Sequence, residues 1–141
     1  MDVSSMLRDD RAAWDELVAI LEARPREVLH DPASPWRWTS RDVYAHLARW
    51  LTRSMDELEA ALAGARLPPL EGTEDEINAR WQREDSSLSL DEARARAREA
   101  FARRVRLIES VPADRWDAAL ERIARYDGAG HYRAHRSYIV Q

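Results

Sequence analysis

The chain has 141 residues and a formal net charge of −4, and 45% of its residues are hydrophobic and 34% charged. This balance is typical of a single globular domain over residues 1–141, and the acidic excess disfavours binding to nucleic-acid phosphates. The chain contains no cysteine, and all 22 of its Lys and Arg residues are arginine. The composition therefore excludes disulfides, thiolate metal ligands, cysteine nucleophiles and chemistry that needs a lysine amine.

Prolines and glycines divide the first half of the chain into two expected helices. Apolar residues recur at helical spacing over residues 6–23, and Pro25 ends this segment. The proline-containing residues 29–38 indicate a loop. A second helix is expected to begin at Thr39, where Thr39-Ser40-Arg41-Asp42 has the order of a capping box, and to end near Gly64.

Two further capping boxes predict helix starts in the second half. Thr73-Glu74-Asp75-Glu76 predicts a short helix through Trp81, and Ser89-Leu90-Asp91-Glu92 predicts a long helix that Pro112 ends. In this motif a hydroxyl and a carboxylate each accept an amide hydrogen of the first turn, so the motif marks the start of a helix.

The last segment, residues 118–139, has helical propensity but contains Gly128 and Gly130. A glycine in a helix interior costs up to about 1 kcal/mol relative to alanine. This cost indicates either a close backbone approach at the glycines or a helix that starts near Asp127. Because no segment alternates like a β-strand, the sequence predicts an all-α antiparallel bundle. It has four main helices and a short extra helix between the second and the third.

No segment is long and apolar enough to span a bilayer, and residues 1–10 have no apolar core that would indicate a signal peptide. We therefore expect a cytoplasmic protein that interacts with neither nucleic acid nor a membrane.

Three of the four histidines form a candidate metal site. His131 and His135 are four residues apart, so on a helix their imidazoles share one face and can bind one divalent ion. His46 has apolar neighbours in the second helix and is expected to point partly inward, whereas His30 lies in the loop and is not expected to be a ligand. Three imidazoles leave metal positions open for water or substrate, and without thiolates the expected ions are Zn, Ni, Fe or Mn. Solvated, capping or core histidines are the alternative interpretation.

The order of the motifs resembles a known family. The segment Trp38-Thr39-Ser40-Arg41-Asp42-Val43-Tyr44-Ala45-His46-Leu47-Ala48-Arg49-Trp50 resembles the second-helix signature of the DinB-like (DinB/YfiT) superfamily. His131-Tyr132-Arg133-Ala134-His135 resembles its last-helix motif. Residues 77–81 with 89–93, and residues 103–116, are similar to the DfsB/ClbS branch. The resemblance covers about residues 5–140.

This resemblance implies an up-down-down-up four-helix bundle, often a homodimer, in which His46, His131 and His135 hold a divalent metal. Characterised relatives include isomerases and S-transferases that use mycothiol, bacillithiol or glutathione as a thiol cosubstrate, and the ClbS branch hydrolyses an electrophilic metabolite. The expected function is metal activation of water or of a low-molecular-weight thiol for attack on an electrophilic small molecule. A non-catalytic bundle that binds and sequesters a small molecule is the alternative.

Four residues beside these ligand positions are candidates for roles in catalysis. Tyr44 and Tyr132 are candidates for hydrogen bonding to water or substrate, although helix packing explains them as well. Asp42, one turn before His46, is a candidate to orient that imidazole, but its capping role is an equal explanation. Asp127 stands in the same relation to His131.

The candidate substrate pocket lies between the second helix and the short helix. Arg49 and Arg53 are suited to an anionic substrate or to the carboxylate of a thiol, with surface salt bridges as the alternative. Trp50, Asn78 and Trp81 are candidates for the mouth of an aromatic-walled pocket, with core packing as the alternative.

Overall fold

A computed structural model describes residues 1–29 and 37–138, and all regular secondary structure in this part of the chain is helical. The all-α prediction is therefore confirmed for the described residues. His30 and most of the expected loop lie outside them. The helices are α1 (Val3–Ala23), α2 (Ser40–Leu62), α3 (Glu74–Glu84), α4 (Leu90–Ser110), α5 (Ala118–Arg125) and α6 (Ala129–Tyr138), with a 3-10 turn, η1 (Ala113–Arg115), before α5.

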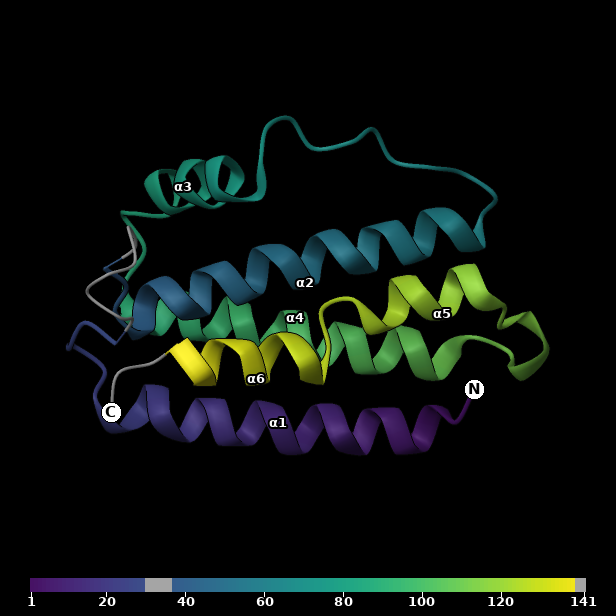
Figure 1. The fold of residues 1–141 in the computed structure, drawn as a ribbon, viewed down its shortest axis with the longest axis horizontal. Coiled ribbons are helices and arrows are strands. Elements are labelled where there is room, and N and C mark those ends of the chain that lie inside the picture. Colours follow the sequence, from purple (N-terminus) through teal and green to yellow (C-terminus); the bar gives the residue numbers. More distant parts are fainter. Residues whose placement is uncertain (30–36, 139–141) are drawn as a thin grey trace.

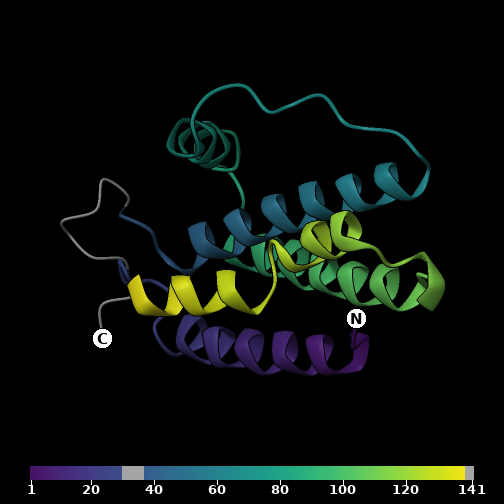
Figure 2. The same ribbon diagram turned by 45° about the vertical axis from the view of Figure 1, so that its right-hand side comes forward.

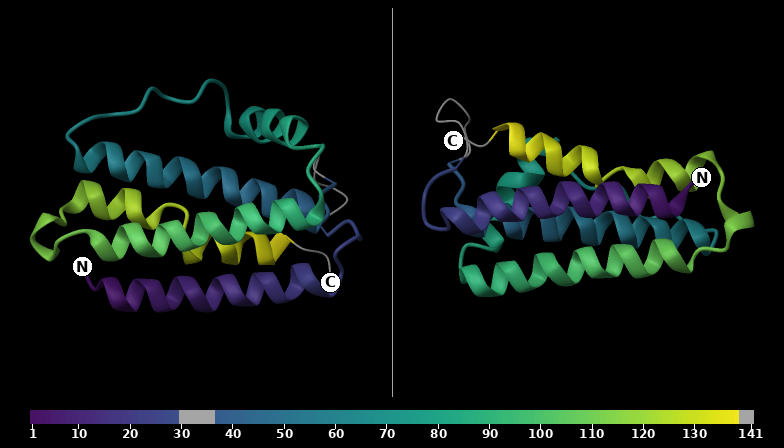
Figure 3. Two further views of the ribbon diagram at one scale, coloured as in Figure 1. Left: turned by 180° about the vertical axis from the view of Figure 1, so that it is seen from behind. Right: turned by 90° about the horizontal axis from the view of Figure 1, so that it is seen from below.

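The long helices lie side by side along one axis of the molecule (Figure 1). α2 and α4 run in one direction, whereas α1 and the consecutive helices α5 and α6 run in the other (Figures 1 and 2). α3 and the connection before it lie outside this layer, along α2, as the view from behind also shows (Figure 3). α6 packs along α1, whereas α5, which directly precedes it, packs along α2 (Figure 1).

The helix starts follow from local capping chemistry. Each of the three expected capping boxes is formed, at Thr39, Thr73 and Ser89, so α2, α3 and α4 begin where the sequence predicts. α1 begins at Val3 rather than at residue 6, because the side chain of Asp2 accepts the N–H of Ser5 at 2.9 Å. α3 continues past Trp81 to Glu84.

The last expected helix is two helices, separated at residues 126–128. A Cβ atom on Gly128 would lie 2.7 Å from Arg104 Nη2 and 2.7 Å from Asp10 Oδ1. Asp10 Oδ1 also accepts the N–H of Ala129 at 2.9 Å, at the first residue of α6. The expected close approach is therefore confirmed at Gly128, whereas a Cβ on Gly130 would meet nothing within 4 Å among the described residues.

Buried apolar side chains form two clusters along the bundle. The first gathers around the amino-terminal half of α2 and includes Trp14, Phe101 and Tyr132. The second lies toward the other end and includes Met6, Met55, Leu58, Ile108 and Leu120. Among the described residues, no helix is long and apolar enough to cross a membrane.

Candidate metal centre

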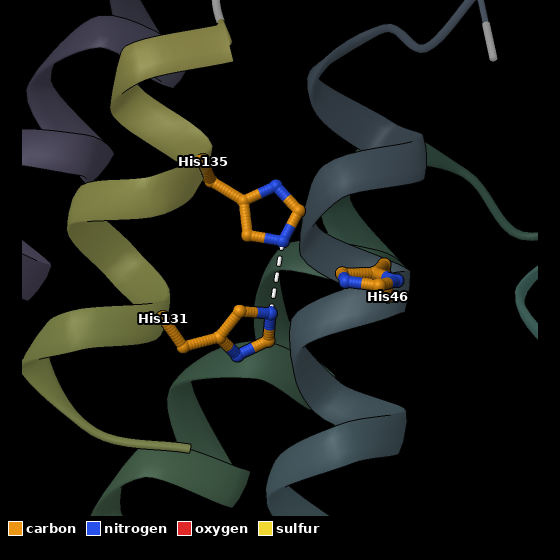
Figure 4. A group of neighbouring side chains, drawn as sticks. All are labelled: His46, His131 and His135. Atoms are coloured by element: carbon orange, nitrogen blue, oxygen red, sulfur yellow. Dashed lines mark hydrogen bonds between the residues drawn. The ribbon is translucent and has the colours of Figure 1, made fainter. Parts of the chain in front are cut away.

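Three imidazoles converge between α2 and α6 (Figure 4). His131 and His135 project from one face of α6, and their Nε2 atoms are 2.9 Å apart. His46 approaches from α2, with its ring centroid 5.4 Å from that of His131 and 4.7 Å from that of His135. One ring nitrogen from each residue lies within 4.8 Å of the other two. The donor set is therefore assembled from two helices that are far apart in the sequence.

The surroundings exclude water from part of the cluster and leave part of it accessible. His135 is 7% exposed, whereas His46 and His131 are half-buried. The indole of Trp38 packs against His46, with ring centroids 4.7 Å apart, and lies 6.3 Å from His135. A half-buried group of imidazoles suits a metal ion that keeps positions open for water or a small molecule.

Asp127 lies directly behind one of these histidines. Its Oδ1 atom is 3.2 Å from Nδ1 of His131, and the residue is 3% exposed. A carboxylate at the far nitrogen of an imidazole fixes its orientation and tautomer and leaves the other nitrogen for a metal. Oδ2 of Asp127 is also buried and forms no hydrogen bond with the described residues.

Asp42 is the other candidate for orienting an imidazole, but both of its carboxylate oxygens form hydrogen bonds at the start of α2. Its Oδ2 accepts the backbone N–H of Thr39 at 3.0 Å, and its Oδ1 accepts Nη2 of Arg41 at 2.7 Å. These contacts account for Asp42 as a capping residue.

Both candidate tyrosines are fully buried in the core. The ring of Tyr132 packs between Trp14 and Phe101, at centroid distances of 5.1 and 6.1 Å. Tyr44 faces α4, where the guanidinium of Arg94 lies 5.9 Å from the centre of its ring. Burial raises the pKa of both phenols, that of Tyr44 to about 12, so neither is an acid–base group near neutral pH.

Four of the five candidate pocket residues, all except Arg53, form one contact group that joins α3 to α2. Nε1 of Trp50 donates a hydrogen bond of 2.8 Å to Oδ1 of Asn78, and the indoles of Trp50 and Trp81 meet edge to face at 4.9 Å. Arg49 donates to both carboxylate oxygens of Asp85, at 3.0 and 2.8 Å. The structure thus brings these residues together. The guanidinium of Arg49 is already paired with the carboxylate of Asp85.

Three cavities lie along α2. A hollow of about 10 Å³ beside His46 is walled by Trp38, Asn78 and Trp81, and it has room for about one water molecule. A groove of about 600 Å³ between α2 and α4 includes Arg49 and Trp81. A pocket of about 330 Å³ between α2 and the α5 region is lined by Trp50 and Asp127. The candidate pocket residues therefore contribute to three different cavities.

Sequence reasoning missed several residues of the third cavity, among them Tyr126 and Arg122. A spacing signal was present, because His46 and Trp50 are four residues apart on α2, as are Asp127 and His131 on the other wall. Each spacing shows only that two residues share a helix face. The pocket follows only when α2 is also known to pack against the end of α5.

Comparison with known proteins identifies a fold. The crystal structure of an uncharacterised protein from Escherichia coli UTI89 is similar, with a TM-score of 0.76 and 16% sequence identity, over 96% of this chain and 91% of that chain. No protein-family model matches the sequence, and no curated protein matches it. This likeness extends over nearly the whole chain and shows a shared helical fold alone.

Proposed function

We propose that this chain is a DinB-like bundle with up-down-down-up topology, in which His46, His131 and His135 bind one divalent metal ion. The convergence of these imidazoles carries the proposal, since ligand atoms from α2 and α6 lie within 4.8 Å of one another. α2 and α4 run in one direction, and α1 and the consecutive helices α5 and α6 run in the opposite direction (Figure 1). This arrangement supports the topology. An imidazole donor set without thiolates suits Zn, Ni, Fe or Mn.

A divalent ion held by three imidazoles lowers the pKa of a water molecule or thiol bound to it and so supplies a nucleophile near neutral pH. The proposed reaction is attack by water or by a low-molecular-weight thiol on an electrophilic small molecule. Since the chain has no cysteine, any thiol comes from a cosubstrate.

The chain's own residues surround this site. Oδ1 of Asp127 lies 3.2 Å from Nδ1 of His131, a contact that places a carboxylate behind this imidazole, and Nε2 of His131 faces His135. The indole of Trp38 shields one side of His46 and His135 from water, which strengthens electrostatic interactions at the cluster.

Metal content measured on untagged protein tests this proposal. We expect about one divalent ion per chain in the wild type, and loss of the ion in His131→Ala and His46→Ala with unchanged helical circular dichroism. Arg133→Ala is the matched control, because this exposed residue of α6 pairs with Asp9 rather than with the histidines. A wild-type protein that stays free of metal after addition of zinc, nickel and manganese would overturn the proposal.

Turnover separates an enzyme from a protein that sequesters its ligand. The metal-loaded enzyme should consume an excess of electrophile with water or added thiol, as a hydrolase or a thiol transferase or isomerase does. Protection that stops at one equivalent per chain would favour the binding protein. The homodimer that the family resemblance implies is tested separately, by sedimentation equilibrium.

A further inference from the structure

The third cavity is a pocket between α2 and the end of α5, with a volume of about 330 Å³. We call it the α2–α5 pocket. This volume is at the lower end of the range for small-molecule sites, about 300–1,000 Å³. The lining residues used below are Trp50, Arg53, Glu57, Arg122, Tyr126 and Asp127.

The α2–α5 pocket continues the face that carries the histidines. Trp50 follows His46 by four residues, so both side chains lie on the same face of α2, one turn apart. On the opposite wall, Asp127 lines the pocket and is 3.2 Å from His131. A molecule in the pocket therefore has its inner end about one helical turn from the candidate metal ligands.

The aromatic walls of the pocket suit a flat apolar molecule. Trp50 is 8% exposed and is fixed by its hydrogen bond to Asn78. Tyr126 at the rim is 62% exposed, an unusual amount for a large aromatic side chain. Tyr126 therefore offers an exposed ring at the rim that a bound aromatic molecule could cover.

The charges of the pocket leave one cation without a partner. Arg53 donates to Glu57 at 2.7 Å and to the carbonyl of Pro68 at 2.8 Å, so these two charges balance. Asp127 lies against His131. Among residues 1–29 and 37–138, Arg122 forms neither a hydrogen bond nor an ion pair. Its exposed guanidinium is therefore available to an anion.

Asp127, which lines the pocket beside His131, carries an acceptor atom without a partner among the described residues. Oδ2 of Asp127 is buried and forms no hydrogen bond to any residue that the structure describes. A buried acceptor without a partner is costly. A donor on a bound molecule would remove this cost.

We propose that the α2–α5 pocket binds a small aromatic anion that carries a hydrogen-bond donor at the end opposite its charge. The anionic group pairs with Arg122 at the rim, the flat body lies between Trp50 and Tyr126, and the donor reaches Asp127. The assignment of this molecule as the substrate rests on the proposed metal function, whereas its binding in the pocket does not.

Isothermal titration calorimetry with 6-hydroxy-2-naphthoate and its neutral amide tests the proposal. We expect the carboxylate to bind at least about fivefold more tightly than the amide, and Arg122→Gln to remove this preference while Arg122→Lys retains it. Arg125→Gln is the matched control, because Arg125 is an exposed arginine of α5 that pairs with Glu121. Tyr126→Ala should weaken the binding of both compounds.

Equal affinity for the carboxylate and the amide, or equal effects of Arg122→Gln and Arg125→Gln, would overturn the proposal. Metal content measured on the same preparations distinguishes the two ideas. A protein that binds metal but not the naphthoate contradicts the proposed ligand of the α2–α5 pocket and leaves the proposed metal centre intact. A protein without metal that binds the naphthoate through Arg122 contradicts the metal centre alone.

Discussion

Asp10 and Arg104 form an ion pair in the interior of the bundle, with side chains that are 3% and 0% exposed. Nε and Nη2 of Arg104 donate to Oδ2 of Asp10 at 3.0 and 2.9 Å. The other oxygen of Asp10 accepts the N–H of Ala129 at the start of α6. One carboxylate of α1 therefore links α4 to the helix that carries two of the three histidines.

Removal of Asp10 should destabilise the protein strongly. Asp10→Ala leaves the Arg104 charge buried without its partner, and we expect a loss of about 3–5 kcal/mol in the free energy of unfolding. Urea denaturation followed by circular dichroism measures this loss. Asp9→Ala is the control, because Asp9 is on the surface and its pair with Arg133 is exposed. Equal stabilities of the two variants would contradict the role of the buried pair.

The break between α5 and α6 makes a second prediction possible. Gly128→Ala places a methyl group 2.7 Å from Arg104 Nη2 and Asp10 Oδ1, two side chains that are buried and paired with each other. We expect a loss of about 1–3 kcal/mol. The methyl group of Gly130→Ala meets no described residue within 4 Å, and residue 130 lies within α6, so this substitution should stabilise the protein by about 0.5–1 kcal/mol. Thermal denaturation of both variants measures the difference, and a more stable Gly128→Ala would contradict the close approach.

Features that depend on neighbours in the sequence could be predicted. The capping boxes at Thr39, Thr73 and Ser89 act within four residues, so the starts of α2, α3 and α4 follow from the sequence. The pair of Asp10 and Arg104 joins residues 94 positions apart, and no local pattern indicates it. The break between α5 and α6 lies against this pair, so the local sequence indicated two alternatives there without deciding between them.

The histidine cluster was likewise predicted from residues that are neighbours in the sequence. The spacing of His131 and His135 identifies two members on one helix face, and the apolar neighbours of His46 indicate that it points inward. The roles of the neighbouring residues depend on which helices touch. Tyr44 and Tyr132 face the core, and Arg122 reaches a pocket that exists only because α2 and α5 pack together.

Asp127 and Asp42 should differ in their effect on metal affinity. Asp127→Asn removes the carboxylate charge that lies 3.2 Å from Nδ1 of His131, and we expect the affinity for a divalent ion to fall by about 10- to 100-fold. Asp42→Asn should leave the affinity unchanged and cost about 0.5–1 kcal/mol of stability, because Asp42 caps α2. Competition with a chromophoric chelator measures the affinities. Similar losses of affinity in the two variants would contradict this division of roles.

The buried phenols should make the protein sensitive to high pH. Burial raises the pKa of Tyr44 from its usual value of 10.0 to about 12, and it also raises the pKa of Tyr132. The folded state binds these phenol protons more tightly than the unfolded state does. The contribution of the protonated phenols to the free energy of unfolding is therefore fully present below pH 10. It is lost progressively as the pH rises between about 10 and 12.

Tyr44→Phe removes one of these titrating groups, so its stability should fall less steeply with pH over this range than that of the wild type. The free energy of unfolding in urea at several pH values measures this slope. Tyr126→Phe is the control. Because Tyr126 is 62% exposed, folding changes the pKa of its phenol less than that of Tyr44. If Tyr44→Phe and the wild type lose stability with the same slope above pH 10, the phenol of Tyr44 ionises as readily in the folded protein as in the unfolded chain.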